Sequence, residues 1–109
     1  MTENKKKLIW EQAKIKRFNP AIWRQDLAGA WIKWDDYGKQ TDFGWTIDHI
    51  IPISQGGDDS LENLQPLHWR NNLEKGDNYP QYNTIISSGI NKDGNDCNIE
   101  KKQSWNRNL

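Results

Sequence analysis

The chain has 109 residues, which is enough for one hydrophobic core and too few for two independent ones. Apolar residues make up 34% of it and the mean hydropathy is −1.06, so no segment approaches the ~20 apolar residues of a membrane span. Fifteen basic residues balance fifteen acidic ones, which taken alone argues against a nucleic-acid partner. The start of the chain lacks the apolar stretch of a signal peptide, so we expect a soluble, cytoplasmic protein.

Covalent cross-links do not stabilise this chain. Cys97 is its single cysteine, which excludes an internal disulfide and a cysteine-rich zinc site. Seven Trp, three Tyr and two Phe can instead bury enough area for a core in a polar chain.

Taken in chain order, the first half predicts one helix and two strands. Residues 3–17 have helix-forming composition and end near Asn19-Pro20. Residues 30–34 and 44–51 are rich in aromatic and β-branched types, and the polar stretch 35–42 would join them as a hairpin.

The second half predicts a glycine-containing loop over 54–59, an extended segment over 64–67, and a short helix over 69–75 that Gly76 ends. Residues 83–87 favour one more strand and 92–96 a turn, whereas 98–109 carry no clear pattern. The order of elements indicates a single α+β domain over 1–109, with a motif core at 44–77, an N-terminal extension at 1–43 and a C-terminal tail at 78–109.

Polar residues of catalytic type follow the second strand. Asp48 and His49 are adjacent there, so on a regular strand their side chains would point to opposite faces, and Pro52 makes an irregularity plausible. A carboxylate suits a hard cation such as Mg²⁺, and an imidazole can take a proton from water at neutral pH. Alone, each residue would more simply be a hydrogen-bonded strand-end carboxylate or a half-buried histidine.

Two asparagines extend this set. Asn63 follows the Gly-Gly loop, where asparagine commonly ties the backbone, and such a clamp would position His49. Asn72 lies four residues after His68, so the two would share one face if the short helix starts by His68, while Trp69 and Leu73 would form its core face. Alone, Asn72 would be an ordinary solvated helix residue.

The ordered string resembles the HNH endonuclease motif, which is carried on the ββα-metal fold. The match covers residues 44–77: the Asp-His pair, Pro52, the Gly-Gly loop, the string Asn-Leu-Gln-Pro-Leu and the ending Asn-x-x-Lys-Gly-Asp. Residues 23–45 add a weaker similarity to small free-standing bacterial HNH proteins. The resemblance therefore implies a ββα-metal core with an N-terminal helix and a preceding hairpin.

The resemblance implies a role for each motif residue, in a His-Asn-Asn variant of the family. His49 falls on the general base, Asn63 on the residue that orients loop and base, and Asp48 and Asn72 on the ligands of one divalent ion. That ion would be Mg²⁺, with Mn²⁺ or another divalent ion as alternatives. The reaction would be metal-dependent hydrolysis of DNA phosphodiester bonds, and no further cofactor-binding residues are implied.

The chain departs from relatives that hold a structural zinc with two Cys-x-x-Cys pairs. The positions of the second pair are His68 and Asn71 here, so no structural zinc is expected and tryptophans such as Trp45 and Trp69 would stabilise the module. His68 stays open between a third ligand, a phosphate contact and a structural role. Arg70 and Lys75 are further candidates for phosphate contacts.

Charge is unevenly distributed. Residues 1–34 hold eight basic and three acidic groups, whereas 35–109 hold seven basic and twelve acidic groups. The basic segment could attract a polyanion, and a bound cation would offset acidic charge at the site. Cations expected to grip the substrate upstream of the motif are Lys5, Lys6, Lys7, Lys14, Lys16, Arg17 and Arg24. No base-reading element is evident, so low sequence specificity is expected.

Two other functions fit parts of the sequence. A nucleic-acid-binding module on the same fold could have lost catalysis, although Asp48, His49, Asn63 and Asn72 are all present. A partner-binding protein could use exposed aromatic residues. Between DNA and RNA, and between monomer and homodimer, the sequence does not decide.

Overall fold

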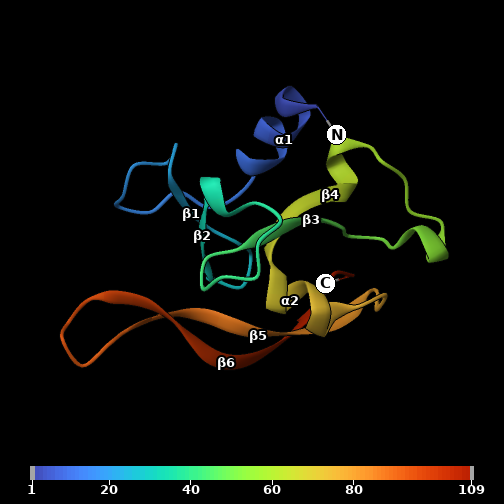
Figure 1. The fold of residues 1–109 in the computed structure, drawn as a ribbon. Coiled ribbons are helices and arrows are strands. Elements are labelled where there is room, and N and C mark those ends of the chain that lie inside the picture. The colour runs from blue at the N-terminus through green and yellow to red at the C-terminus, as the bar shows by residue number, and fades with distance from the viewer. Residues whose placement is uncertain (1, 109) are drawn as a thin grey trace.

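The structure, a computed structural model, describes residues 2–108 as an α+β fold (Figure 1). Its helices are α1 (Glu3–Trp10) and α2 (Trp69–Lys75), and its strands are β1 (Trp23–Gln25), β2 (Trp31–Lys33), β3 (Trp45–His49), β4 (Leu64–His68), β5 (Gln81–Ile90) and β6 (Asp96–Asn106). Three short 3₁₀ helices span Trp34–Asp36, Ile53–Gln55 and Leu61–Asn63. No helix within residues 2–108 has the length and apolar character to cross a membrane.

The strands pair as three separate antiparallel ribbons: β1 with β2, β3 with β4, and β5 with β6. In Figure 1, β3 and β4 cross the centre of the molecule, α1 lies above them, and α2 leads down to the long β5–β6 hairpin. Strand β4 continues directly into α2, so an antiparallel strand pair followed by a helix forms the middle of the fold.

The predicted pairing of residues 30–34 with 44–51 is wrong. Strand β2 pairs with β1, and β3 pairs with β4 in a register that places Asp48 opposite Gln65. Local composition marks both segments as strands but does not select the partner. Pro66 in β4 is tolerated because each strand of a two-stranded sheet is an edge, so its missing N–H costs no ladder bond on the outer side.

The first helix is shorter than the predicted 3–17. Thr2 caps α1 by accepting a hydrogen bond from the Lys5 amide at 3.1 Å, and the helix ends at Trp10. Beyond it, Lys14 forms an isolated antiparallel bridge with Gln25, so β1 draws this segment into an extended conformation. Tertiary pairing thus overrides helix-forming composition here.

Aromatic residues form the core, as the composition predicts. Trp45 is fully buried and packs against Trp10, with ring centroids 5.1 Å apart, and against Tyr37 at 4.9 Å. Trp34 completes this group at 5.6 Å from Trp10. Because Trp45 opens β3, the cluster anchors the strand that carries Asp48 and His49.

A buried polar hub joins the N-terminal extension to the motif core. The Asp26 carboxylate is fully buried and accepts hydrogen bonds from the amides of Ala28, Ala30 and His68 and from the Asn71 side chain. Burial raises the pKa of Asp26, and these hydrogen bonds act in the opposite direction. The hub therefore holds the start of α2 against residues 26–30.

The C-terminal region is a long hairpin rather than a tail without pattern. Strand β5 extends well beyond the predicted 83–87, and β6 occupies the segment that had no clear pattern; Leu109 lies outside the described residues. The Asn71 carboxamide oxygen accepts bonds from the amides of Ile85 and Ile86 at 2.8 and 2.7 Å. Helix α2 is thereby fastened to the centre of β5.

Candidate active site

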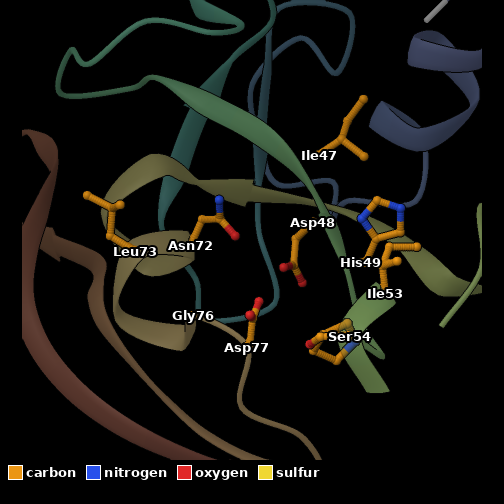
Figure 2. Close-up of a pocket in the computed structure, with 10 residues that line it drawn as sticks. Ile47, Asp48, His49, Ile53, Ser54, Asn72, Leu73, Gly76 and Asp77 are labelled. Atoms are coloured by element: carbon orange, nitrogen blue, oxygen red, sulfur yellow. The ribbon is translucent and has the colours of Figure 1, made fainter. Parts of the chain in front are cut away.

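A cavity of about 500 Å³ opens between the end of β3, the loop that follows it and α2. Its polar lining includes Asp48, His49, Asn72 and Asp77, and its apolar lining includes Ile47 and Leu73 (Figure 2). Three of the four residues singled out in the sequence, Asp48, His49 and Asn72, thus lie around one cavity.

Asp48 is the most firmly held of them. Its side chain is 6% exposed, and it accepts hydrogen bonds from Gln65 Nε2 at 2.9 Å and from Lys75 Nζ at 3.3 Å. Burial raises the pKa of this carboxyl, while the Gln65 bond and the Lys75 charge lower it. An ionised carboxylate offers about four lone-pair sites, so roughly two remain for another partner in the cavity.

His49 leaves β3 in a different direction from Asp48, as strand alternation requires, although both side chains line the cavity (Figure 2). His49 Nε2 lies 2.7 Å from Asp59 Oδ1. An ionised carboxylate can only accept, so Nε2 carries the proton and the lone pair of the neutral ring lies on Nδ1. The same bond lowers the pKa of Asp59.

Asn63 is not in the cavity lining but holds the loop beside it. Its carboxamide accepts a bond from the Ile51 amide at 2.8 Å and donates to the carbonyls of Ile51 at 3.0 Å and Asp58 at 2.8 Å. Gly57 permits this close packing, because a Cβ there would lie 1.7 Å from the Ile51 carbonyl oxygen and 2.9 Å from Asn63 Nδ2. Both ends of the loop between His49 and Asp59 are therefore tied to one side chain.

Asn72 and Asp77 face the cavity from α2 and from just beyond its end (Figure 2). Asn72 is half-buried and Asp77 is exposed. Together with Asp48 they offer two carboxylates and one carboxamide, which are oxygen donors of the type that Mg²⁺ and Ca²⁺ prefer. Within residues 2–108, however, no group of three or more His, Cys, Asp or Glu side chains is arranged to hold a metal ion.

Residues 34–78 match the family model of the HNH endonuclease. This segment is therefore similar to an HNH endonuclease domain. The matched segment includes both strands of the β3–β4 pair, the loop between them and α2, and therefore includes every residue of the cavity lining named above. No curated protein and no solved structure matches the chain.

His68 lies outside the cavity that Asn72 lines, so the two residues do not share one face as expected. Helix α2 begins at Trp69, and His68 is its N-cap, accepting from the Arg70 amide at 3.1 Å. His68 Nε2 donates to the Asp42 carbonyl oxygen at 2.8 Å while Nδ1 accepts, so this ring is neutral and both its nitrogens are used. Burial lowers its pKa. His68 therefore caps and packs the helix, outside the cavity.

Neither Arg70 nor Lys75 is a free cation beside the cavity. Arg70 pairs with Glu100 of β6 at 3.0 Å, on another side of α2. Lys75 is fully buried, and its ammonium also donates to the His49 carbonyl at 3.1 Å. Phosphate contact by Lys75 is therefore excluded in this conformation, and its charge acts on Asp48 instead.

The buried face of α2 is polar, which corrects the expected pairing of Trp69 with Leu73. Leu73 is 68% exposed, while Asn71 and Lys75 are fully buried. These two residues are four apart and therefore lie on one face. The helix turns this face inward because Asn71 reaches Asp26 and β5, and Lys75 reaches Asp48.

The sequence did not indicate three residues of this candidate site. In the sequence, Asp59 belongs to a loop pattern and Asp77 to the end of the motif, and neither pattern indicated a role for these residues. Gln65 holds Asp48 because the two are register partners across β3 and β4. The acidic pair after Gly-Gly hinted at Asp59, but only the folded loop brings it to His49.

Proposed function

We propose that this protein is a metal-dependent HNH endonuclease of the His-Asn-Asn type that hydrolyses DNA phosphodiester bonds. The observation that carries the proposal is the single cavity that Asp48, His49 and Asn72 line within the HNH-matched segment. The family match supports nuclease activity in general, and the arrangement of these side chains supports the finer assignment.

Asp48 and Asn72 would hold one divalent ion, most simply Mg²⁺. The fit rests on the donor set: the cavity offers a buried carboxylate with unused lone pairs and a carboxamide whose side chain makes no hydrogen bond within residues 2–108. Lys75 already balances part of the Asp48 charge, so metal binding without substrate should be weak. When bound, the ion polarises the phosphoryl group and stabilises charge on the leaving oxygen.

His49 would act as the general base. Its Nε2–H is held by Asp59, which leaves Nδ1 to accept a proton from the attacking water. Asn63 would position the base by fixing both ends of the loop between His49 and Asp59.

Attraction for the polyanionic substrate would come from the basic N-terminal segment. The Lys5 ammonium donates to the Asp59 carbonyl at 3.0 Å, and Gln12 donates to the Leu61 carbonyl at 3.2 Å, so α1 lies beside the loop of the site. Arg24, by contrast, is buried and donates to the carbonyls of Pro20 and Glu11, so it is a structural cation. Phosphate contacts of this kind are salt-sensitive.

The test is plasmid nicking with Mg²⁺ or Mn²⁺. Wild-type protein should nick supercoiled DNA, EDTA should abolish it, and His49→Ala should slow it by about 10²- to 10⁴-fold, as loss of a general base does. Asp48→Asn is preferred to Asp48→Ala, because it removes the charge and keeps an acceptor for Lys75. Asp93→Asn, the same change in an exposed turn, should have no effect.

Nicking at equal rates by wild type and by folded His49→Ala would contradict the assigned base. Salt-sensitive DNA binding with no cleavage under any divalent ion would instead indicate the alternative, a catalytically silent nucleic-acid-binding module.

A further inference from the structure

A second cavity lies outside the catalytic one and is walled by aromatic rings. Its volume is about 160 Å³, and it is lined by Phe18, Trp23, Trp31, Phe43 and Asp96. These residues come from the segment between α1 and β1, from β1 and β2, from the segment before β3 and from the first position of β6. In Figure 1, the turn between β5 and β6 lies on the same side of the molecule as β1 and β2.

The four rings form two edge-to-face pairs. Phe18 and Trp31 have centroids 5.4 Å apart at 67°, and Trp23 and Phe43 have centroids 4.8 Å apart at 89°. Phe18 is 42% exposed, which is high for a phenylalanine that packs against a buried tryptophan. The indole N–H of Trp31 is buried without a hydrogen-bond partner in the described part of the chain. The cavity therefore offers aromatic rings on its walls.

Cations flank this aromatic cavity. The Arg17 guanidinium lies over the Phe18 ring, 5.4 Å from its centroid, and also pairs with Asp96. The Lys33 ammonium lies over Trp23 at 5.5 Å. Two positive groups and one carboxylate thus border the rings, so the net charge there is positive. This charge suits a ligand that joins an aromatic ring to a negative group.

We propose that this cavity binds one unstacked pyrimidine base of a single-stranded nucleic acid, with Arg17 and Lys33 contacting the neighbouring phosphates. The proposal rests on the proposed function in so far as the nuclease substrate would supply the strand. An apolar cavity of about 150 Å³ holds benzene, so one six-membered ring fits here and a purine would be only partly enclosed. Proteins that bind single strands commonly stack the bases on aromatic side chains, in addition to contacts between cations and the backbone.

The position suits a strand that also reaches the catalytic cavity. Phe43 precedes β3, and Asp48 lies five residues further along it, roughly 16 Å at ~3.3 Å per residue. A single strand anchored by one base at Phe43 could therefore extend along β3 to the site. Such an anchor would favour unpaired or flipped substrate over intact duplex, because a base in a duplex presents no free face.

A quaternary ammonium ligand is the other chemistry that aromatic walls and a carboxylate could take. The charges around the rings oppose it, since the Asp96 carboxylate is already paired with Arg17 and the Lys33 ammonium would repel a positively charged ligand. The charge around the rings therefore favours the nucleotide.

Fluorescence anisotropy of labelled oligonucleotides in EDTA separates binding from cleavage. At fixed salt, short oligo(dT) and oligo(dC) should bind more tightly than oligo(dA) and than a duplex of equal length. Phe18→Leu should weaken oligo(dT) binding by roughly five- to a hundredfold, the range that loss of one stacking partner produces. Phe18→Trp should retain it. Leu8→Ala is the matched control, because Leu8 is also 42% exposed and lies on α1.

Equal binding of dT and dA strands, or unchanged binding by folded Phe18→Leu and Phe43→Leu, would overturn the proposal. Binding of a trimethyllysine peptide in place of the oligonucleotides would overturn it in favour of the cation ligand. Plasmid nicking reports separately on the proposed function. Pyrimidine-selective binding without nicking would support this cavity as a base site and reject the nuclease. Nicking without pyrimidine-selective binding would support the nuclease and reject the base site.

Discussion

The ammonium of Lys75 lies 3.3 Å from the carboxylate of Asp48, and both side chains are almost completely buried. The last turn of α2 is thereby joined to β3 at the wall of the candidate active site. A buried pair that loses one member leaves an uncompensated charge, which costs about 3–5 kcal/mol. The proposed metal ligand is therefore also part of the fold.

We expect Lys75→Met to lower the free energy of unfolding by about 3 kcal/mol or more, because Asp48 would be buried without its cation. Urea denaturation measures this effect. Lys101→Met, which changes an exposed lysine of β6, serves as control and should change stability little. Equal stability of the two variants would show that the pair does not hold α2 against β3.

Asn71 should be the most sensitive polar position outside the cavity. Its carboxamide bonds to Asp26 at 3.0 Å and to the backbone of β5, so Asn71→Ala would leave several buried groups unsatisfied. We expect a loss of about 3 kcal/mol or more. A double-mutant cycle with Asp26→Asn should give a coupling of about 0.5–3 kcal/mol, and strict additivity would argue against the hub.

Asp59→Asn should slow plasmid nicking by roughly tenfold, since the asparagine amide can donate to Nε2 and favour the tautomer that protonates Nδ1. A buried triad carboxylate contributes about 10⁴-fold, but Asp59 is 76% exposed and water can replace it. The effect should fall on kcat rather than on KM, and Asp58→Asn is the neighbouring control. A rise in KM alone would assign Asp59 to substrate binding instead.

Gly57→Ala should disturb the loop that Asn63 holds. The new Cβ would meet the Ile51 carbonyl oxygen at 1.7 Å, so the backbone must move, at a cost of about 1–3 kcal/mol. Nicking should fall together with stability. Gly56→Ala provides the comparison, because Gly56 has a φ of +92° but no neighbour within 4 Å, so that variant strains the backbone without displacing Asn63.

Stability should fall on acidification through His68. Burial lowers its pKa below the ordinary 6.5, so the unfolded chain binds this proton more readily than the native one. The contribution of the neutral His68 ring to the free energy of unfolding is fully present above about pH 6.5. It is lost as the pH falls through the lowered pKa of the native state. Asparagine can keep the cap without titrating in this range. His68→Asn should therefore lose less stability than wild type between about pH 7.5 and 5, and parallel pH profiles would contradict this.

Much of the segment over residues 34–78 can be predicted from local sequence. The helix over 69–75 has the predicted bounds, because Gly76 and the composition of one short segment suffice to determine it. The order of Asp48, His49 and Asn72 also led to a family that residues 34–78 match. By contrast, the prediction of the buried face of α2 was wrong. From sequence alone, charged and amide side chains are assigned to solvent unless their distant partners are known.

The sequence by itself determined the order of the motif residues, the α+β class and an aromatic core, because composition, spacing and caps act over a few residues. Only the tertiary structure decided that β3 pairs with β4, that Asp59 meets His49, and that Lys75 is buried against Asp48. These contacts join residues 10 to 27 positions apart. They depend on how loops close and which polar groups burial forces into partnership, and no local pattern encodes either.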